Sequence, residues 1–176
     1  MPEQSYLALS SNLRDSESEA TLIGNVYERQ DKIAETRITL EKLLVKAHIE
    51  AKFAWDQGAK EEQMKKALTH IRHAQWRWDY AAASHGGSFH TPIEVGRILS
   101  TGIDKAHQAR REITKVLTQL GYNKDVPMPD VSTKEKAQAY IGLPMKKLNK
   151  EKTEFKKTIL PVWDKKAAER EKTYTK

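Results

Sequence analysis

Apolar side chains recur at intervals of three and four residues through the first third of the chain. The stripe consists of Leu22, Val26, Ile33, Leu40, Leu44, Ala47, Ala51 and Ala54, with Gln30 and Arg37 as polar interruptions. This heptad-like spacing predicts one amphipathic helix over about 16–57, ending at Gly58. Such a helix is roughly 60 Å long, which exceeds a compact domain of this size. One end of this helix is therefore expected to pack against a second copy of the chain or another partner.

Further stretches with a helical period predict helices at about 61–83, 92–120, 133–141 and 145–172. The third predicted helix opens with Thr91 as N-cap, Pro92 in the first position and Glu94 completing a capping box. Pro161 is expected to kink the last helix. No segment shows a strand period with hairpin turns. The predicted fold class is all-α, an elongated bundle of long antiparallel helices, with a single helical domain at 16–176 after an irregular lead-in at 1–15.

Composition narrows the possible functions. The chain has 176 residues, of which 38% are apolar and 31% charged, as expected for one folded domain. No apolar run is long enough for a membrane span. The first residues lack the basic and apolar segments of a secretory signal, so no intact signal peptide is expected. Cysteine is absent, which excludes disulfides, thiolate catalysis and thioether-attached haem on this chain.

The net charge of +7 is concentrated near the C-terminus, where residues 143–176 hold 11 basic and 5 acidic side chains. A basic amphipathic segment is most often a solvated helix face. Nucleic-acid binding is not expected, because aromatic side chains are not interleaved with these lysines at a base-stacking spacing.

The segment 70–94 carries the densest candidate chemistry, with four histidines, two tryptophans, a tyrosine and two arginines. His70 and His73 lie one helical turn apart, but no third ligand follows at a zinc spacing. His85 and His90 lie in a glycine-rich loop before a capped helix. A histidine held in this way has a free ring nitrogen and a fixed direction, as an axial metal ligand requires. The nearby aromatic and arginine side chains suit a flat anionic partner such as a haem, although a packed aromatic face explains Trp78 equally well.

The run IRHAQWRWDYAAASHGGSFHTPIE resembles the C-terminal region of the ammonia-forming pentahaem cytochrome c nitrite reductases. GRILSTGIDKAHQARREI, PDVSTKEKAQAYIGLPM and FKKTILPVW continue the similarity in the same order, so that it covers about 16–165. In that family the region is a set of long helices that covers the haem-bearing part and builds the homodimer contact. The family acts in the bacterial periplasm, and the resemblance implies the same location here.

The resemblance also implies roles for individual residues. His90 matches the histidine that serves as the distal axial ligand of a haem c whose attachment motif lies earlier in the chain. His85, Trp76, Arg77 and Trp78 match the surrounding motif, and we expect them to pack and form hydrogen bonds around that haem.

The family's CxxCH and CxxCK motifs are missing, so this chain is not expected to reduce nitrite by itself. The expected function is that of a helical domain that supplies His90 to a haem held by an N-terminal part of the enzyme and that forms a homodimer. A haem-free structural or dimerisation module is the alternative. A deliberate fragment, a truncated reading frame, a degenerate relative and an engineered version all remain open as origins.

Overall fold

The structure is a computed structural model that describes residues 19–174, and within this range it contains helices and no strands. The described chain divides after Val126 into two compact units. The sequence predicted a single helical domain over 16–176. The division falls in the segment 122–131, which contains two prolines and no helix. The predicted lead-in at 1–15 lies outside the described residues.

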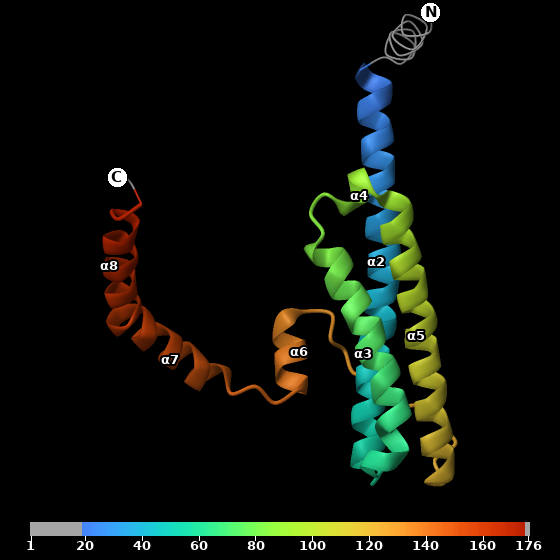
Figure 1. Ribbon diagram of the computed structural model, residues 1–176. Helices are drawn as coiled ribbons and strands as arrows, with labels where there is room; N and C mark the ends of the chain where they lie inside the picture. The colour runs from blue at the N-terminus through green and yellow to red at the C-terminus, as the bar shows by residue number, and fades with distance from the viewer. Residues whose placement is uncertain (1–18, 175–176) are drawn as a thin grey trace, which may run out of the picture. The chain divides into compact units, whose positions relative to one another are not determined.

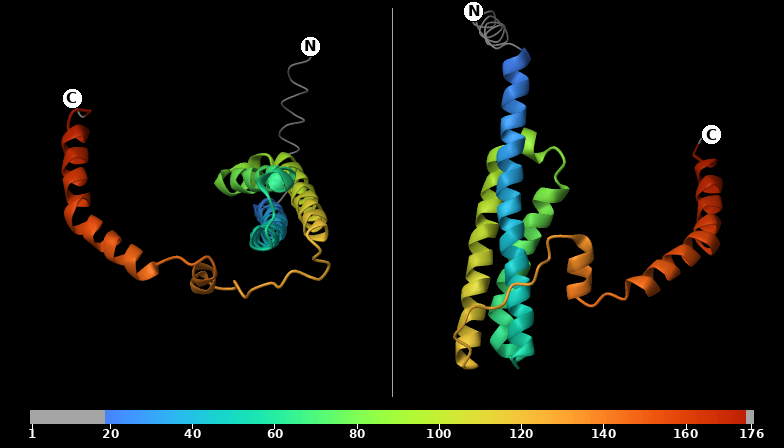
Figure 2. Two further views of the ribbon diagram at one scale, coloured as in Figure 1. Left: turned by 90° about the horizontal axis from the view of Figure 1, so that it is seen from below. Right: turned by 180° about the vertical axis from the view of Figure 1, so that it is seen from behind.

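Three long helices make up the first unit: α2 (Glu19–Asp56), α3 (Glu61–Ala83) and α5 (Pro92–Gln119). Each runs antiparallel to the one before it, so that α2 and α5 point the same way, and each of the three packs against the other two (Figures 1 and 2). The short helix α4 (Gly87–His90) joins α3 to α5. The predicted all-α class with long antiparallel helices is therefore confirmed.

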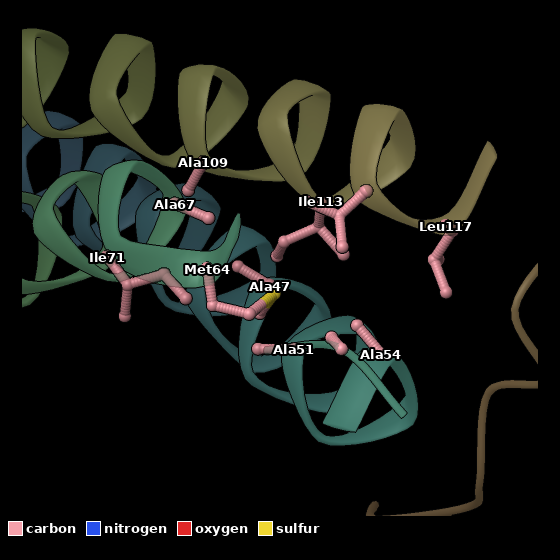
Figure 3. Close-up of a cluster of buried hydrophobic side chains, with 11 residues drawn as sticks. Ala47, Ala51, Ala54, Met64, Ala67, Ile71, Ala109, Ile113 and Leu117 are labelled. Atoms are coloured by element: carbon pink, nitrogen blue, oxygen red, sulfur yellow. The ribbon is translucent and has the colours of Figure 1, made fainter. Parts of the chain in front are cut away.

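Two clusters of buried side chains hold these helices together. One lies at the α2–α3 turn and consists of Ala47, Ala51, Ala54, Ala59, Met64, Ala67, Ile71, Ala109, Ile113, Val116 and Leu117 (Figure 3). The other consists of Leu40, Leu44, Ala74, Ala81, Val95, Leu99 and Ala106. The many alanines let the helix backbones approach closely around a few large side chains. Such burial is the main favourable contribution to folding.

The packing of α2 on α5 includes one close approach and one buried ion pair. A Cβ placed on Gly102 would lie 2.6 Å from Leu40 Cδ2, so α5 needs a glycine at this crossing. Further along, Arg110 donates from Nε and Nη2 to the buried Glu50 carboxylate, with its Nη2 2.6 Å from Glu50 Oε1. This hydrogen bonding raises the pKa of Arg110. A bidentate pair of this kind fixes how far the two helices slide past each other.

The stripe predicted on the first helix is buried only over its second half. Leu40, Leu44, Ala47, Ala51 and Ala54 are buried, whereas Leu22 is 51% exposed. Helix α2 extends beyond the start of α5, so its first turns have no neighbouring helix among the described residues of this unit (Figure 1). These first turns are the part of the stripe that the chain does not bury within its described residues.

The second unit contains α6 (Lys134–Tyr140), α7 (Met145–Thr158) and α8 (Leu160–Glu171). The predicted helix 145–172 is thus two helices that meet at Ile159, just before Pro161. Proline has no backbone N–H and its ring clashes with the preceding turn, which accounts for the break. Neither α7 nor α8 has a buried residue, and Phe155, Val162 and Trp163 are exposed. No helix in the described range is long and apolar enough to cross a membrane.

Candidate functional site

The connection between α3 and α5 is more regular than the loop expected from its glycines. Residues 87–90 form one helical turn, in which the His90 N–H donates to Gly86 O at 2.9 Å and the Thr91 N–H donates to Gly87 O at 3.1 Å. Gly86 adopts an ordinary right-handed conformation, with φ −96° and ψ −5°. The pair Gly86–Gly87 therefore continues a helical path here.

The helix start at Thr91 and Pro92 lies where the sequence predicted it, but the expected capping box is absent. The Thr91 hydroxyl donates back to Gly87 O at 3.4 Å and caps no N–H of α5. The Glu94 carboxylate instead accepts two hydrogen bonds from Arg97, three residues later on the same helix. That ion pair lowers the pKa of Glu94. The Arg97 guanidinium thus takes the carboxylate that the predicted capping box would have used.

His90 ends α4 with an exposed imidazole that makes no hydrogen bond to any described residue. Its ring meets Phe89 edge-on, with ring centroids 4.8 Å apart. A Cβ on Gly86 would lie only 3.0 Å from His90 Cδ2, so the absence of a side chain at Gly86 makes room for the ring. His90 is therefore held from two sides while its nitrogens stay available.

The His90 imidazole lines an open hollow of about 690 Å³ between α2 and the start of α5. Its walls are Asn25, Glu28, Arg29, Lys32, Ile33, Phe89, His90, Pro92 and Ile93. Phe89 and Ile93 are exposed apolar side chains, and Arg29 and Lys32 supply positive charge from α2. The hollow thus combines a free imidazole, an apolar wall, two cations and the carboxylate of Glu28.

His85 lines a second, smaller hollow of about 250 Å³. The wall residues are Gln30, Ile33, Ala34, Arg37, Ala81, Ala82, Ser84, His85 and Ser88. Ile33 of α2 belongs to both hollows, so His85 and His90 line neighbouring depressions on one side of the bundle.

The three α3 residues expected around a haem lie apart from the His90 hollow, since none of them is among its wall residues. Trp76 is exposed and stacks on Tyr80 at 5.7 Å between ring centroids. Arg77 donates from Nη1 to His73 O at 2.7 Å. Trp78 packs against the cluster around Leu40, and its buried Nε1 has no acceptor among the described residues. The described residues therefore place Trp78, half-buried, against the core and Trp76 on the surface.

Sequence reasoning missed the cationic wall of the His90 hollow. Arg29 and Lys32 lie three residues apart on α2 and so share a face, which was a signal available in the sequence. Arg37 was seen only as a break in an apolar stripe.

The paired histidines of α3 show no metal-binding arrangement. His70 Nδ1 is buried without a hydrogen-bond partner, and burial, followed by Lys105 and Lys66, lowers the pKa of His70. Within the described range no three metal-ligating side chains gather. His70 is therefore a half-buried histidine that meets no metal-ligand cluster among the described residues.

Comparison with known proteins decides the family. The family model for cytochrome c552 matches residues 13–172, nearly the whole chain. The chain belongs to the cytochrome c552 family. A cytochrome c-552 from Bacteroides fragilis is 64% identical over 151 residues, and one from Parabacteroides distasonis is 61% identical over 153 residues. A third, from Porphyromonas gingivalis, is 59% identical over 151 residues.

The cytochrome c552 family membership confirms the resemblance to the ammonia-forming nitrite reductases. The alignments cover 86% to 87% of this chain but only 30% to 31% of those relatives, so the chain spans about a third of their length. The family binds haem c, whereas this chain has no cysteine to attach one.

Proposed function

We propose that this cytochrome c552 chain is the C-terminal helical part of an ammonia-forming nitrite reductase. In this proposal His90 is the distal axial ligand of a haem c that is attached to another part of the enzyme. That haem would transfer electrons for the six-electron reduction of nitrite to ammonium, and the present chain would not be catalytic by itself. The observation that carries the proposal is the exposed, unpartnered imidazole of His90 at the mouth of its hollow.

The residues around His90 fit the edge of a haem. Axial ligation needs a neutral imidazole with one free nitrogen lone pair, and no described residue competes for that lone pair. Phe89, Pro92 and Ile93 offer an apolar surface to a porphyrin ring. Arg29 and Lys32 offer positive charge to its carboxylates. When bound, a haem with two histidine ligands supplies one-electron transfer, while this chain's residues hold and orient it.

A homodimer through the long helices is the second part of the proposal. The exposed Leu22, Ile23 and Tyr27 lie on the turns of α2 that extend beyond α5. Apolar side chains at helical spacing are favourable to bury against a symmetric partner. The periplasmic location is also a proposal, and it rests on the family alone.

A haem-c peptide tests the role of His90. Such a peptide carries one covalently attached haem with its own proximal histidine and an open sixth position. We expect the chain to shift the Soret band of this peptide saturably towards the spectrum of a haem with two histidine ligands. His90→Ala should remove the shift, because it removes the sixth ligand.

His107→Ala is the matched control, since His107 is an exposed histidine on α5 outside the His90 hollow. It should leave the shift unchanged. An equal shift from the wild type and His90→Ala would contradict the haem-ligand proposal. With both variants folded, that result would favour the haem-free dimerisation module.

A further inference from the structure

A half-buried arginine without a partner lies at the smaller hollow, the one lined by Arg37 and His85. Arg37 Nε is buried, and Arg37 makes no hydrogen bond or ion pair with any described residue. A buried polar group that lacks a hydrogen bond is costly, so native structures rarely retain one without a reason. Charged groups are more costly still.

The other half-buried arginines of the described chain show what Arg37 lacks. Arg110 donates from Nε to Glu50 Oε1 at 3.0 Å and Oε2 at 2.9 Å. Arg77 donates to a backbone carbonyl. Arg37 has neither kind of acceptor, although Glu41 lies four residues later on the same helix.

The walls of the hollow contain no negative charge. The polar side chains are Gln30, Arg37, Ser84, His85 and Ser88, and none of them is a carboxylate. The Trp78 Nε1–H is a second donor without a partner among the described residues. It lies near the hollow, because Trp78 is one turn before the wall residues Ala81 and Ala82 on the same face of α3. The site thus offers hydrogen-bond donors and has no carboxylate among its wall residues.

We propose that this hollow binds a carboxylate, with the Arg37 guanidinium as the principal donor. Arginine and a carboxylate form short, charge-assisted, often bidentate hydrogen bonds, as Arg110 and Glu50 do here. The carboxylate belongs either to a haem propionate or to a free small acid. The proposal goes beyond the ligand role of His90, and the carboxylate site exists whether or not His90 binds iron.

Propionate ion is the first probe, read out by the Nε–H resonance of Arg37 in proton–nitrogen NMR spectra. We expect a saturable downfield shift with sodium propionate that sodium chloride at the same ionic strength does not produce. Arg37→Lys keeps the charge but removes Nε, and it should weaken propionate binding about tenfold or more, as measured on neighbouring backbone amides. Arg111→Gln, which removes an exposed cation of α5 outside both hollows, should bind propionate like the wild type.

A second titration distinguishes a haem propionate from a free small acid as the source of the carboxylate. The haem-c peptide and its propionate methyl ester are each titrated into the wild type and Arg37→Gln. A loss of affinity in Arg37→Gln that appears with the free propionates and vanishes with the ester identifies a haem propionate. The same affinity in both proteins, together with the propionate response, identifies a free small acid.

Two results would overturn the carboxylate site. One is an Arg37 resonance that does not respond to propionate. The other is a response that chloride reproduces. The propionate titration on His90→Ala keeps this test separate from the haem-ligand proposal, because a carboxylate site independent of haem ligation predicts an unchanged response in that variant.

Discussion

Gly86 illustrates how a single residue sets the position of the candidate ligand. Its hydrogen-only side chain leaves space for the His90 ring, and its backbone conformation is one that alanine also adopts. The glycine at position 86 is therefore needed to make room for the His90 ring, whereas the backbone turn does not require it.

Gly86→Ala is predicted to weaken binding of the haem-c peptide while preserving the fold. The new Cβ pushes the imidazole from its preferred position, at a cost of about 0.5–1.5 kcal/mol. Isothermal titration calorimetry checks the affinity, and thermal melting checks the fold. Gly24→Ala is the control, since a Cβ there meets nothing within 4 Å. Equal affinities in wild type and Gly86→Ala would contradict this account of the glycine.

His70 is predicted to make stability depend on pH. Burial lowers the pKa of His70 in the folded protein below the ordinary value of 6.5. As the pH falls below 6.5 the unfolded chain takes up this proton first, so the free energy of unfolding decreases; above 6.5 the contribution is fully present.

Melting temperatures recorded on both sides of that pH check this prediction. His70→Gln should flatten the dependence, whereas His107→Gln, on an exposed face, should keep it. Identical pH profiles for the wild type and His70→Gln would show that His70 does not contribute.

At the scale of helices, several ends follow from residues that the sequence displays. Gly58 and Gly121 follow the ends of α2 and α5 with φ of 89° and 82°, the left-handed conformation that glycine adopts without strain. Helix α4 was not foreseen, because two consecutive glycines indicate a loop when backbone hydrogen bonds are unknown. The predicted capping box at Thr91 was also wrong, because the Glu94 carboxylate pairs with Arg97 instead of the backbone of Thr91.

The crossing of α2 and α5 at Gly102 gives a prediction at this scale. Gly102→Ala should lower the free energy of unfolding by about 1–3 kcal/mol, because the new Cβ overlaps Leu40 and pushes the helices apart. Chemical denaturation measures the change. Gly96→Ala, whose Cβ would meet Ile33 Cδ1 at 3.7 Å, should instead be neutral or stabilise by about 0.5–1 kcal/mol. A destabilisation of Gly96→Ala equal to that of Gly102→Ala would contradict the argument.

For the whole molecule, the sequence predicted the fold class and the long helices. It did not predict which part of the apolar stripe of α2 is buried against the other helices. The stripe alone could not show that Leu40 and Leu44 face α3 and α5 while Leu22 has no such cover. The candidate site was also only partly predictable. His90 stood out by its glycine-rich surroundings, whereas the role of Arg37 depends on which helix faces it.

The uncovered start of α2 predicts a dimer that depends on it. Leu22→Lys with Ile23→Lys should shift the protein towards monomer, because charges replace the apolar contact surface. Sedimentation velocity over a concentration series measures this shift. Trp163→Lys, on the exposed face of α8, is the comparison and should leave the dimer intact. Loss of the dimer in Trp163→Lys alone would place the contact elsewhere.

The most direct test of the haem-ligand account is the electron paramagnetic resonance spectrum of the ferric haem-c peptide bound to this chain. We predict the low-spin signal of a haem with two histidine ligands. In His90→Ala that signal should be lost, and added imidazole should restore it. A low-spin signal that persists in His90→Ala without imidazole would contradict the account, because another group would then be the sixth ligand.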